Sequence, residues 1–223
     1  MTGASGFSIV VAMDRKRGIG FKGDLPWPKL KGDMRFFREL TTCPDRAAVE
    51  KRWGLKAGES GEVQRWEDVS AMLKFAHPLP AASDEKRNAV IMGRKTWGSL
   101  PEQYRPLPDR YNEVLTGRAA SGTGLLHRIS GQQLARVWSS LEESIQSVAS
   151  SAEIFLIGGG QAYLAGLKSQ ECRHLYVTEI DAEFPCDTYF PETPDFKPAL
   201  SSPWIDEGGV RYRFRRYDRI SGS

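Results

Sequence analysis

The chain has 223 residues, of which 40% are hydrophobic and 26% charged, and its formal net charge is +3. This composition is that of a folded globular protein, and it excludes a fibrous, collagen-like or largely disordered chain. The length suits a single domain with a full core. The mild basicity suits an anionic small molecule as readily as a nucleic acid, so charge alone does not choose between these ligands.

The cysteines, histidines and N-terminus indicate where the protein works. Cys43, Cys172 and Cys186 are an odd number, lie far apart and have no metal-ligand spacing, and neither do the three histidines. This pattern predicts free thiols in a reducing compartment and no metal site. Residues 1–6 form neither a signal core nor an Arg-rich transit pattern, and no apolar run approaches the roughly 20 residues of a membrane span. We therefore expect a cytoplasmic protein that does not enter a membrane.

Predicted strands and helices alternate along the chain. Continuous apolar runs predict strands at 7–13, 88–92, 111–115, 153–157 and 175–180, and helical spacing predicts helices at 30–40, 141–149 and from about 161. This alternation predicts an α/β fold with a mainly parallel central β-sheet and helices on both faces. Residues 210–217 alternate apolar side chains with arginines, which predicts an antiparallel C-terminal edge strand with one face in solvent.

Residues 43–87 interrupt this alternation. The segment is rich in charged and small residues around two helix-like patches at 46–55 and 63–75. An unstructured loop of this length would be unusual in a compact domain. We expect a single domain over residues 1–223 that carries residues 43–87 as a surface insertion with helices of its own and no part in the chemistry.

One carboxylate lies where the local pattern calls for a hydrophobic residue. Leu30, Asp33, Met34 and Phe37 recur at the spacing of one helical face, so Asp33 should point inward, and residues 23–28 form a stiff apolar turn before the helix. A buried carboxylate needs a partner or takes up a proton. We expect a ligand as the partner of Asp33 and a raised pKa for its carboxyl group.

Asp33 and Arg110 can each also be interpreted as ordinary surface residues. If the helix is rotated slightly, Asp33 could cap a neighbouring helix or pair with Lys29 or Arg35 on the surface. Arg110 precedes the strand at 111–115, at the edge of the expected cleft, where it could hold a carboxylate through two hydrogen bonds. It could instead be a surface arginine that pairs with Asp109 or with water.

Three predicted strand ends carry residues suited to phosphate groups. The strand at 153–157 is followed by Gly158, Gly159 and Gly160 and then by a helix, which lets backbone N–H groups approach an anion. Glycine, hydroxyl and cationic residues also occur at the ends of two more predicted strands. Residues 93–97 follow the strand at 88–92, and residues 115–118 lie at the end of the strand at 111–115. Because ligands in open α/β sheets bind at the carboxyl ends of strands, the three together predict a dinucleotide with an additional phosphate. Each alone could be a packing turn or a solvated basic turn, and none is a Rossmann fingerprint or a P-loop.

Taken together, these motifs resemble the dihydrofolate reductase family. The matching segments occur in the family's order and spacing at 18–20, 25–28, 33–37, 90–97, 105–110 and 157–160. The resemblance runs from residue 7 to residue 218, and residues 43–87 are its main interruption. This insertion and residues 183–187 are similar to the reductase part of protist bifunctional dihydrofolate reductase–thymidylate synthases. No synthase segment is present, which predicts an excised or stand-alone reductase.

The resemblance implies reduction of 7,8-dihydrofolate to 5,6,7,8-tetrahydrofolate by hydride transfer from NADPH, in support of one-carbon metabolism and thymidylate synthesis. In this family the residue matching Asp33 binds the pterin and promotes protonation of N5. Trp27 and Thr178 match residues that hold an ordered water near that carboxylate, and Leu25 matches the mobile loop over the nicotinamide. Implied partners are dihydrofolate, antifolates such as methotrexate and a thymidylate synthase domain absent from this chain.

The family's binding residues map onto this sequence. Positions that line the folate pocket correspond to Val10, Val11, Asp33, Met34, Phe37, Ser99, Leu100, Leu107, Arg110, Ile157, Tyr163 and Thr178. Cofactor contacts correspond to Ala12, Ile19, Gly20, Gly93, Arg94, Lys95, Thr96, Leu115, Thr116, Gly117, Arg118, Gly158, Gly159, Gly160, Gln161, Ala162 and Tyr163. The bond between Gly158 and Gly159 is expected to be cis. The family often has Ser-Arg at Thr116-Gly117, so Arg118 or Arg94 would supply the cation for the 2′-phosphate.

Two other functions stay open. A pyrimidine reductase of riboflavin synthesis shares the fold, but the inward Asp33 and Arg110 favour a folate substrate. A nucleic-acid-binding module could use the arginines of residues 211–219. The aromatic residues lie on the opposite side of that strand from the arginines, which disfavours base stacking between them.

Overall fold

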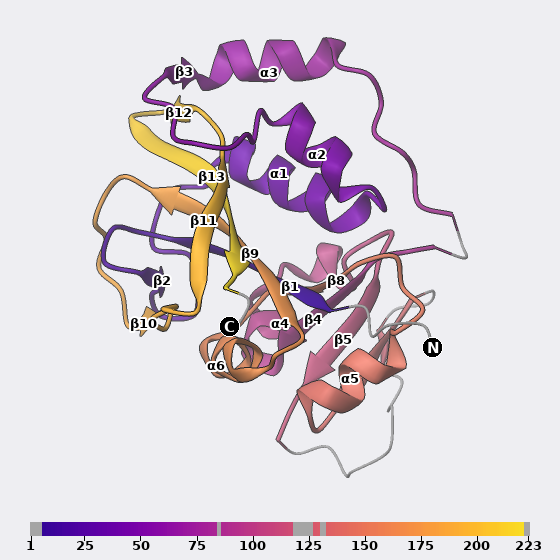
Figure 1. Cartoon of the computed structure of the whole chain (residues 1–223). Coiled ribbons are helices and arrows are strands. Elements are labelled where there is room, and N and C mark those ends of the chain that lie inside the picture. Colours follow the sequence, from indigo (N-terminus) through magenta and orange to yellow (C-terminus); the bar gives the residue numbers. More distant parts are fainter. Residues whose placement is uncertain (1–5, 84–85, 118–126, 130–132, 221–223) are drawn as a thin grey trace.

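The computed structural model describes residues 6–83, 86–117, 127–129 and 133–220. Within them, an 11-stranded sheet crosses the molecule in the order β3-β12-β13-β9-β1-β8-β4-β5-β7-β6, with β11 beside β13 (Figure 1). Its strands are β1 (Phe7–Met13), β3 (Val63–Arg65), β4 (Ala89–Gly93), β5 (Tyr111–Leu115), β6 (His127–Ile129), β7 (Gln133–Trp138), β8 (Ile154–Leu156), β9 (Cys172–Ile180), β11 (Phe196–Ser201), β12 (Trp204–Glu207) and β13 (Val210–Arg219). A separate pair joins β2 (Gly18–Gly20) to β10 (Thr188–Tyr189).

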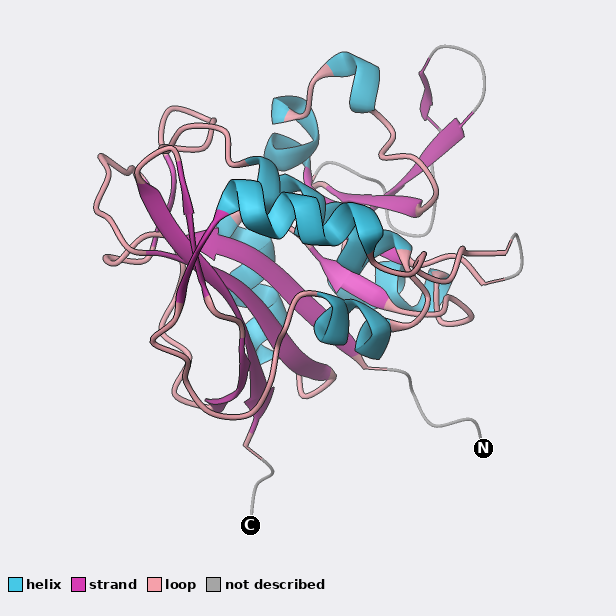
Figure 2. Ribbon diagram, turned by 90° about the horizontal axis from the view of Figure 1, so that it is seen from above, coloured by secondary structure: helices cyan, strands magenta, loops and turns pink. Residues whose placement is uncertain are grey.

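Helices cover both faces of this sheet, as Figure 2 shows from above. They are α1 (Lys31–Thr42), α2 (Arg46–Arg52), α3 (Trp66–Phe75), α4 (Arg94–Ser99), α5 (Leu141–Ser147) and α6 (Gly160–Lys168), with a short 3₁₀ turn η1 (Glu102–Tyr104). Residues of α1, α2 and α3 share one apolar cluster with the sheet, and residues of α5 and α6 share the other. Because neighbouring residues of a strand point to opposite faces, Val10 and Val11 of β1 fall in different clusters.

The α/β architecture predicted from the sequence is confirmed. Strands β9, β1, β8, β4, β5 and β7 run parallel to their neighbours in this order. The C-terminal strand β13 is antiparallel to β9, and β11 and β12 continue the sheet beyond it. Every predicted strand and helix lies within a few residues of an observed one.

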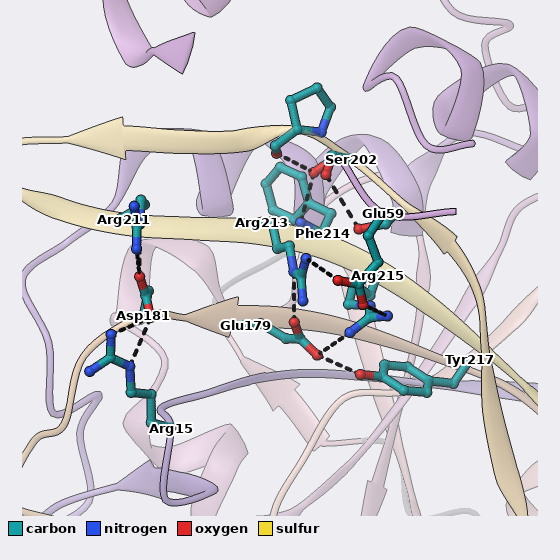
Figure 3. A network of polar contacts seen from close by, with 12 residues as sticks. Arg15, Glu59, Glu179, Asp181, Ser202, Arg211, Arg213, Phe214, Arg215 and Tyr217 are labelled. Carbon is teal, nitrogen blue, oxygen red and sulfur yellow. Dashed lines mark hydrogen bonds and ion pairs between the residues drawn. The ribbon is translucent and has the colours of Figure 1, made fainter. Parts of the chain in front are cut away.

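The predicted solvent face of β13 is wrong. Arg213 and Arg215 are only 9% and 8% exposed. Glu179 of β9 accepts a hydrogen bond from Arg213 at 2.8 Å, and Glu59 accepts one from Arg215 at 2.8 Å (Figure 3). The chain around Glu59 and the side chains of β9 cover this face, so the two buried arginines pair with the half-buried Glu179 and the exposed Glu59. They are therefore not free to bind a nucleic acid backbone.

Residues 43–87 form α2, β3 and α3, so both helix-like patches contain helix as predicted. The segment also supplies core side chains: Val49, Trp53, Leu55, Val69 and Leu73 are buried in the cluster that includes α1. Trp53 packs edge-on against Phe36 of α1, with ring centres 5.6 Å apart. Residues 43–87 are therefore not only a surface insertion, because their buried side chains pack against α1.

The cysteines agree with the prediction of free thiols. Cys43 and Cys172 are buried, Cys186 is half-buried, and all three are free. Among the described helices, none has both the length and the apolar character needed to cross a membrane.

Candidate active site

Asp33 lies in the first turn of α1 and is only 5% exposed. Its Oδ1 accepts a hydrogen bond of 2.7 Å from the hydroxyl of Thr178, near the carboxyl end of β9. Burial raises the pKa of Asp33 from 3.8 to about 6, the Thr178 hydrogen bond opposes this rise, and the charge of Glu207 adds to it. The inward orientation and raised pKa predicted from the sequence are confirmed. The alternative surface pairing is wrong, because Arg35 pairs with Glu39 at 2.9 Å.

The turn before α1 brings two of the predicted catalytic residues to the helix entrance. Trp27 is buried and packs edge-on against Phe184, with ring centres 6.0 Å apart. Its indole N–H has no hydrogen-bond partner among the described residues. A buried N–H normally has an acceptor, so this one fits a bound water or a ligand atom. Leu25, on the same turn, is 43% exposed, as suits a residue that contacts an incoming ligand.

Several predicted folate-pocket residues share the apolar cluster of Trp27. The members are Val10, Phe37, Leu100, Leu107 and Ile157. Met34 is half-buried on α1. These residues come from β1, α1, the chain after α4, the loop before β5 and the end of β8. The structure thus brings together an apolar wall from five distant segments.

Three predicted pocket residues are placed differently. Val11 points into the cluster on the opposite face of the sheet, because adjacent residues of a strand alternate. Tyr163 lies in that same cluster, although its hydroxyl donates a 2.8 Å hydrogen bond to the backbone carbonyl of Val10. Ser99 is exposed and donates to the Thr96 carbonyl at 2.9 Å. The side chains of Val11 and Tyr163 therefore do not form part of the apolar wall.

Arg110 is 5% exposed, which excludes the surface interpretation. It donates to the carbonyl of Pro108 at 3.0 Å and to the hydroxyl of Thr41, and its guanidinium lies 5.8 Å from the ring centre of Phe37. Burial lowers the pKa of Arg110 to about 10, so it stays cationic at neutral pH. No ion-pair partner of Arg110 occurs within the described chain. A buried cation without a carboxylate partner fits an anionic ligand group.

The glycine-rich strand end lies next to a second predicted phosphate site. Strands β8, β4 and β5 are neighbours in the sheet, so their carboxyl ends lie side by side. The N–H of Gly93 donates to the Gly158 carbonyl at 2.7 Å, and the Gly158–Gly159 bond is cis as expected. A Cβ on Gly158 would lie 2.7 Å from Thr96 Oγ1, so only glycine fits there. Helix α6 then begins at Gly160 without a side-chain cap, which leaves N–H groups for an anion.

Other predicted cofactor residues lie at the start of α6, at the start of α4 and at the end of β5. Gln161 and Ala162 form the first turn of α6. Arg94 and Lys95 are exposed at the start of α4. Leu115 ends β5, and Gly117 is exposed just after it, with open space where a side chain would be. The backbone N–H of Thr116 donates to the Trp138 carbonyl at 3.0 Å. Arg118 lies outside the described residues.

The loop after β1 carries the predicted nicotinamide contacts. Ala12 pairs in register with Thr178, while Ile19 and Gly20 belong to β2. Asp14, 4% exposed, organises this loop, because its carboxylate accepts backbone N–H groups from Lys16 at 2.9 Å and Gly18 at 2.7 Å. It also accepts the N–H of Phe184 at 3.0 Å, which joins the loop to the chain after β9. Sequence reasoning missed this role, because Phe184 is 170 residues away.

The fold and the site together define an α/β protein with a buried carboxylate at the edge of an apolar cluster and glycine-lined strand ends suited to anions. The family model described as dihydrofolate reductase matches residues 84–219, and the chain belongs to this family. The chain is 30% identical to "Dihydrofolate reductase" of Aedes albopictus over 96% of this chain and 97% of that protein. It is 28% identical to "Dihydrofolate reductase" of Mus musculus, over 95% and 96% of the two chains.

Bifunctional proteins are also among the relatives. The chain is 32% identical to "Bifunctional dihydrofolate reductase-thymidylate synthase" of Daucus carota over 97% of this chain but 34% of the relative. The chain therefore spans about a third of the length of that relative, while it covers nearly all of the monofunctional ones.

Proposed function

We propose that this protein reduces 7,8-dihydrofolate to 5,6,7,8-tetrahydrofolate with NADPH. One observation carries the proposal: Asp33 is buried at the entrance of α1, hydrogen-bonded to Thr178, with a pKa of about 6. A carboxyl group that titrates close to neutral pH can bind the pterin and also help to deliver a proton. Membership of the dihydrofolate reductase family supplies the substrate that such a group would meet.

Different residues of the chain would bind the pterin ring, the ordered water and the glutamate tail. Asp33 accepts hydrogen bonds from the 2-amino group and N3 side of the pterin and promotes protonation of N5. The indole N–H of Trp27 would hold the ordered water near this carboxyl group, together with the hydroxyl of Thr178. Val10, Phe37 and Leu107 exclude bulk water from the ring, which strengthens these polar contacts. Arg110 holds the α-carboxylate of the glutamate tail through its unpartnered N–H groups.

Bound NADPH would supply the hydride that reduces the pterin at C6. The glycine turn 158–160 and the first turn of α6 would bind its pyrophosphate, and Ala12, Ile19 and Gly20 would line the nicotinamide. Arg94 or Arg118 would pair with the 2′-phosphate and so favour NADPH over NADH. The open backbone of Gly93 and Gly158, which touch through a 2.7 Å hydrogen bond, supports close approach of a dinucleotide here.

Three further proposals concern inhibitors, a partner domain and the location of the protein. Antifolates such as methotrexate would occupy the pterin site through Asp33, because they present a similar amino-substituted ring. A thymidylate synthase domain is a candidate partner, supported by the bifunctional relatives of which this chain spans about a third. The three free cysteines support the expected cytoplasmic location.

The test is a spectrophotometric assay of NADPH oxidation with and without dihydrofolate. We expect dihydrofolate-dependent oxidation that methotrexate abolishes. Asp33→Asn should remove nearly all turnover at neutral pH and leave NADPH binding intact, since the asparagine cannot supply a proton. Folded protein that binds NADPH but shows no dihydrofolate-dependent signal would contradict the proposal.

A further inference from the structure

The helix that carries Asp33 begins without a cap from its own sequence. The N-cap position of α1 is Leu30, whose side chain cannot accept a hydrogen bond. The first N–H groups of a helix need acceptors from elsewhere. Here the acceptor comes from β12, about 175 residues later in the chain.

Glu207, the last residue of β12, supplies this acceptor with both carboxylate oxygens. Oε1 accepts the backbone N–H of Lys31 at 2.7 Å, and Oε2 accepts that of Gly32 at 3.0 Å. The hydroxyl of Tyr212, on β13, donates to the same Oε2 at 2.9 Å. A negative charge at a helix N-terminus also interacts favourably with the helix dipole. The carboxylate is thus held between the start of α1 and the sheet.

The local sequence permits this close contact. A Cβ on Gly32 would overlap the Tyr212 hydroxyl oxygen and lie 2.9 Å from a ring atom of Trp66. Glycine at this position therefore lets the first turn of α1 rest directly on Tyr212 and Glu207. Asp33 is the next residue in the chain, so the position of the cap determines how far its carboxyl group lies from Thr178.

We propose that Glu207 is a positioning residue of the active site: it fixes the first turn of α1, and with it Asp33 against Thr178, and places a negative charge beside that carboxyl group. This inference rests on the proposed reduction of dihydrofolate only for its catalytic consequence. Glu207 touches neither substrate nor cofactor in this assignment. It acts through α1 and through its charge.

Three groups from neighbouring strands face the carboxyl group of Asp33. Thr178 on β9 donates a hydrogen bond, and Glu207 on β12 and Tyr212 on β13 are the ionisable neighbours. On α1 itself, Arg35 is engaged with Glu39. The charge of Glu207 raises the pKa of Asp33, after the larger effect of burial. Without that charge Asp33 would ionise at lower pH.

The central experiment compares Glu207→Gln with Asp206→Asn. Both changes remove one negative charge from β12, but Asp206 contacts the turn after β12, through the N–H of Gly209 at 3.3 Å, and not α1. A ¹³C NMR titration of the Asp33 carboxyl, assigned with Asp33→Asn, needs no substrate. We expect Glu207→Gln to lower the titration midpoint by roughly a few tenths of a pH unit or more, since a charge this close acts through a low effective dielectric. Asp206→Asn should leave the midpoint almost unchanged.

The pH profile of turnover gives the catalytic readout. The alkaline limb of Glu207→Gln should move to lower pH by the same amount, while its affinity for NADPH stays unchanged. An unchanged Asp33 midpoint in Glu207→Gln, or an equal shift in Asp206→Asn, overturns the inference. If the Asp33 titration midpoint changes as expected but the protein has no reductase activity, only the proposed function is refuted.

Hydrogen exchange tests the cap even if Glu207→Gln does not fold. In the unmodified protein the amides of Lys31 and Gly32 should exchange roughly tenfold or more slowly than in an unstructured chain, because both are bonded to Glu207. Exchange of both amides at the unstructured rate would overturn the inference.

Discussion

Replacing Asp33 by asparagine should make the protein more stable at neutral pH while it removes turnover. The pKa of Asp33 is about 6 in the folded protein, against 3.8 in its ordinary state, so the folded state binds this proton more tightly. The stability contributed by Asp33 is therefore fully present below pH 3.8 and is lost as the pH rises through 6. A difference of about 2 pKa units corresponds to ~3 kcal/mol of unfolding free energy at about pH 7.5. The neutral amide of the asparagine variant carries no such penalty.

The assay is urea unfolding of both proteins at about pH 7.5 and about pH 4. At the higher pH we expect Asp33→Asn to raise the unfolding free energy by up to ~3 kcal/mol, less whatever the amide loses in its contact with Thr178. At the lower pH the difference should nearly vanish. Asp45→Asn is the matched control, since it makes the same change at an exposed helix N-cap where asparagine caps equally well. If Asp33→Asn is no more stable than the original protein at the higher pH, then the claim that burial destabilises the charged form of Asp33 is refuted.

Three further changes test other parts of the site. Thr178→Val removes the 2.7 Å hydrogen bond that lowers the pKa of Asp33, so the alkaline limb of the activity profile should move up by roughly 1 to 2 pH units, and an unmoved limb would contradict this contact's role. Arg110→Met should raise KM for dihydrofolate ~10-fold or more and leave kcat nearly unchanged, because it removes the proposed contact of a buried guanidinium to the glutamate tail, whereas the exposed Arg65→Met should change neither. Gly158→Ala places a Cβ 2.7 Å from Thr96 Oγ1 at a φ of +149°, so it should cost ~1–3 kcal/mol in urea unfolding and weaken NADPH binding, while Gly61→Ala, whose Cβ would meet no atom within 4 Å, should do neither.

Elements whose structure depends on their own residues could be predicted from the sequence. The strand at 7–13 was predicted at its observed bounds, because a continuous apolar run is itself the requirement of a strand buried on both faces. Asp33 was predicted to point inward for a similar reason, since helical spacing fixes the direction of a side chain. Strands β7 and β12 were not predicted, because they mix polar with apolar residues and lack a continuous apolar run.

Contacts between distant segments left no signal in the sequence. The arginines of β13 are an example, since their alternation is that of a solvated strand until Glu59 and Glu179 are placed against them. Glu207 and Asp14 are others, because Glu207 bonds a backbone N–H 176 residues away and Asp14 bonds one 170 residues away. A backbone N–H is present at every residue except proline, so no side-chain pattern marks where such a bond will form.

The two halves of the sheet contribute to the site in different ways. Parallel strands β8, β4 and β5 bring glycine-rich ends together, and the requirement there is space, which glycine meets locally. The antiparallel side, β9, β13 and β12, instead sets the protonation of one carboxyl group through two opposed contacts: the Thr178 hydrogen bond stabilises the charged form of Asp33, and Glu207 stabilises the neutral form. Glu207 also accepts the first N–H groups of α1, so the residue whose charge acts on Asp33 also holds the helix that carries it. The pKa and the geometry of Asp33 are therefore coupled through one residue, and a change that alters one should alter the other.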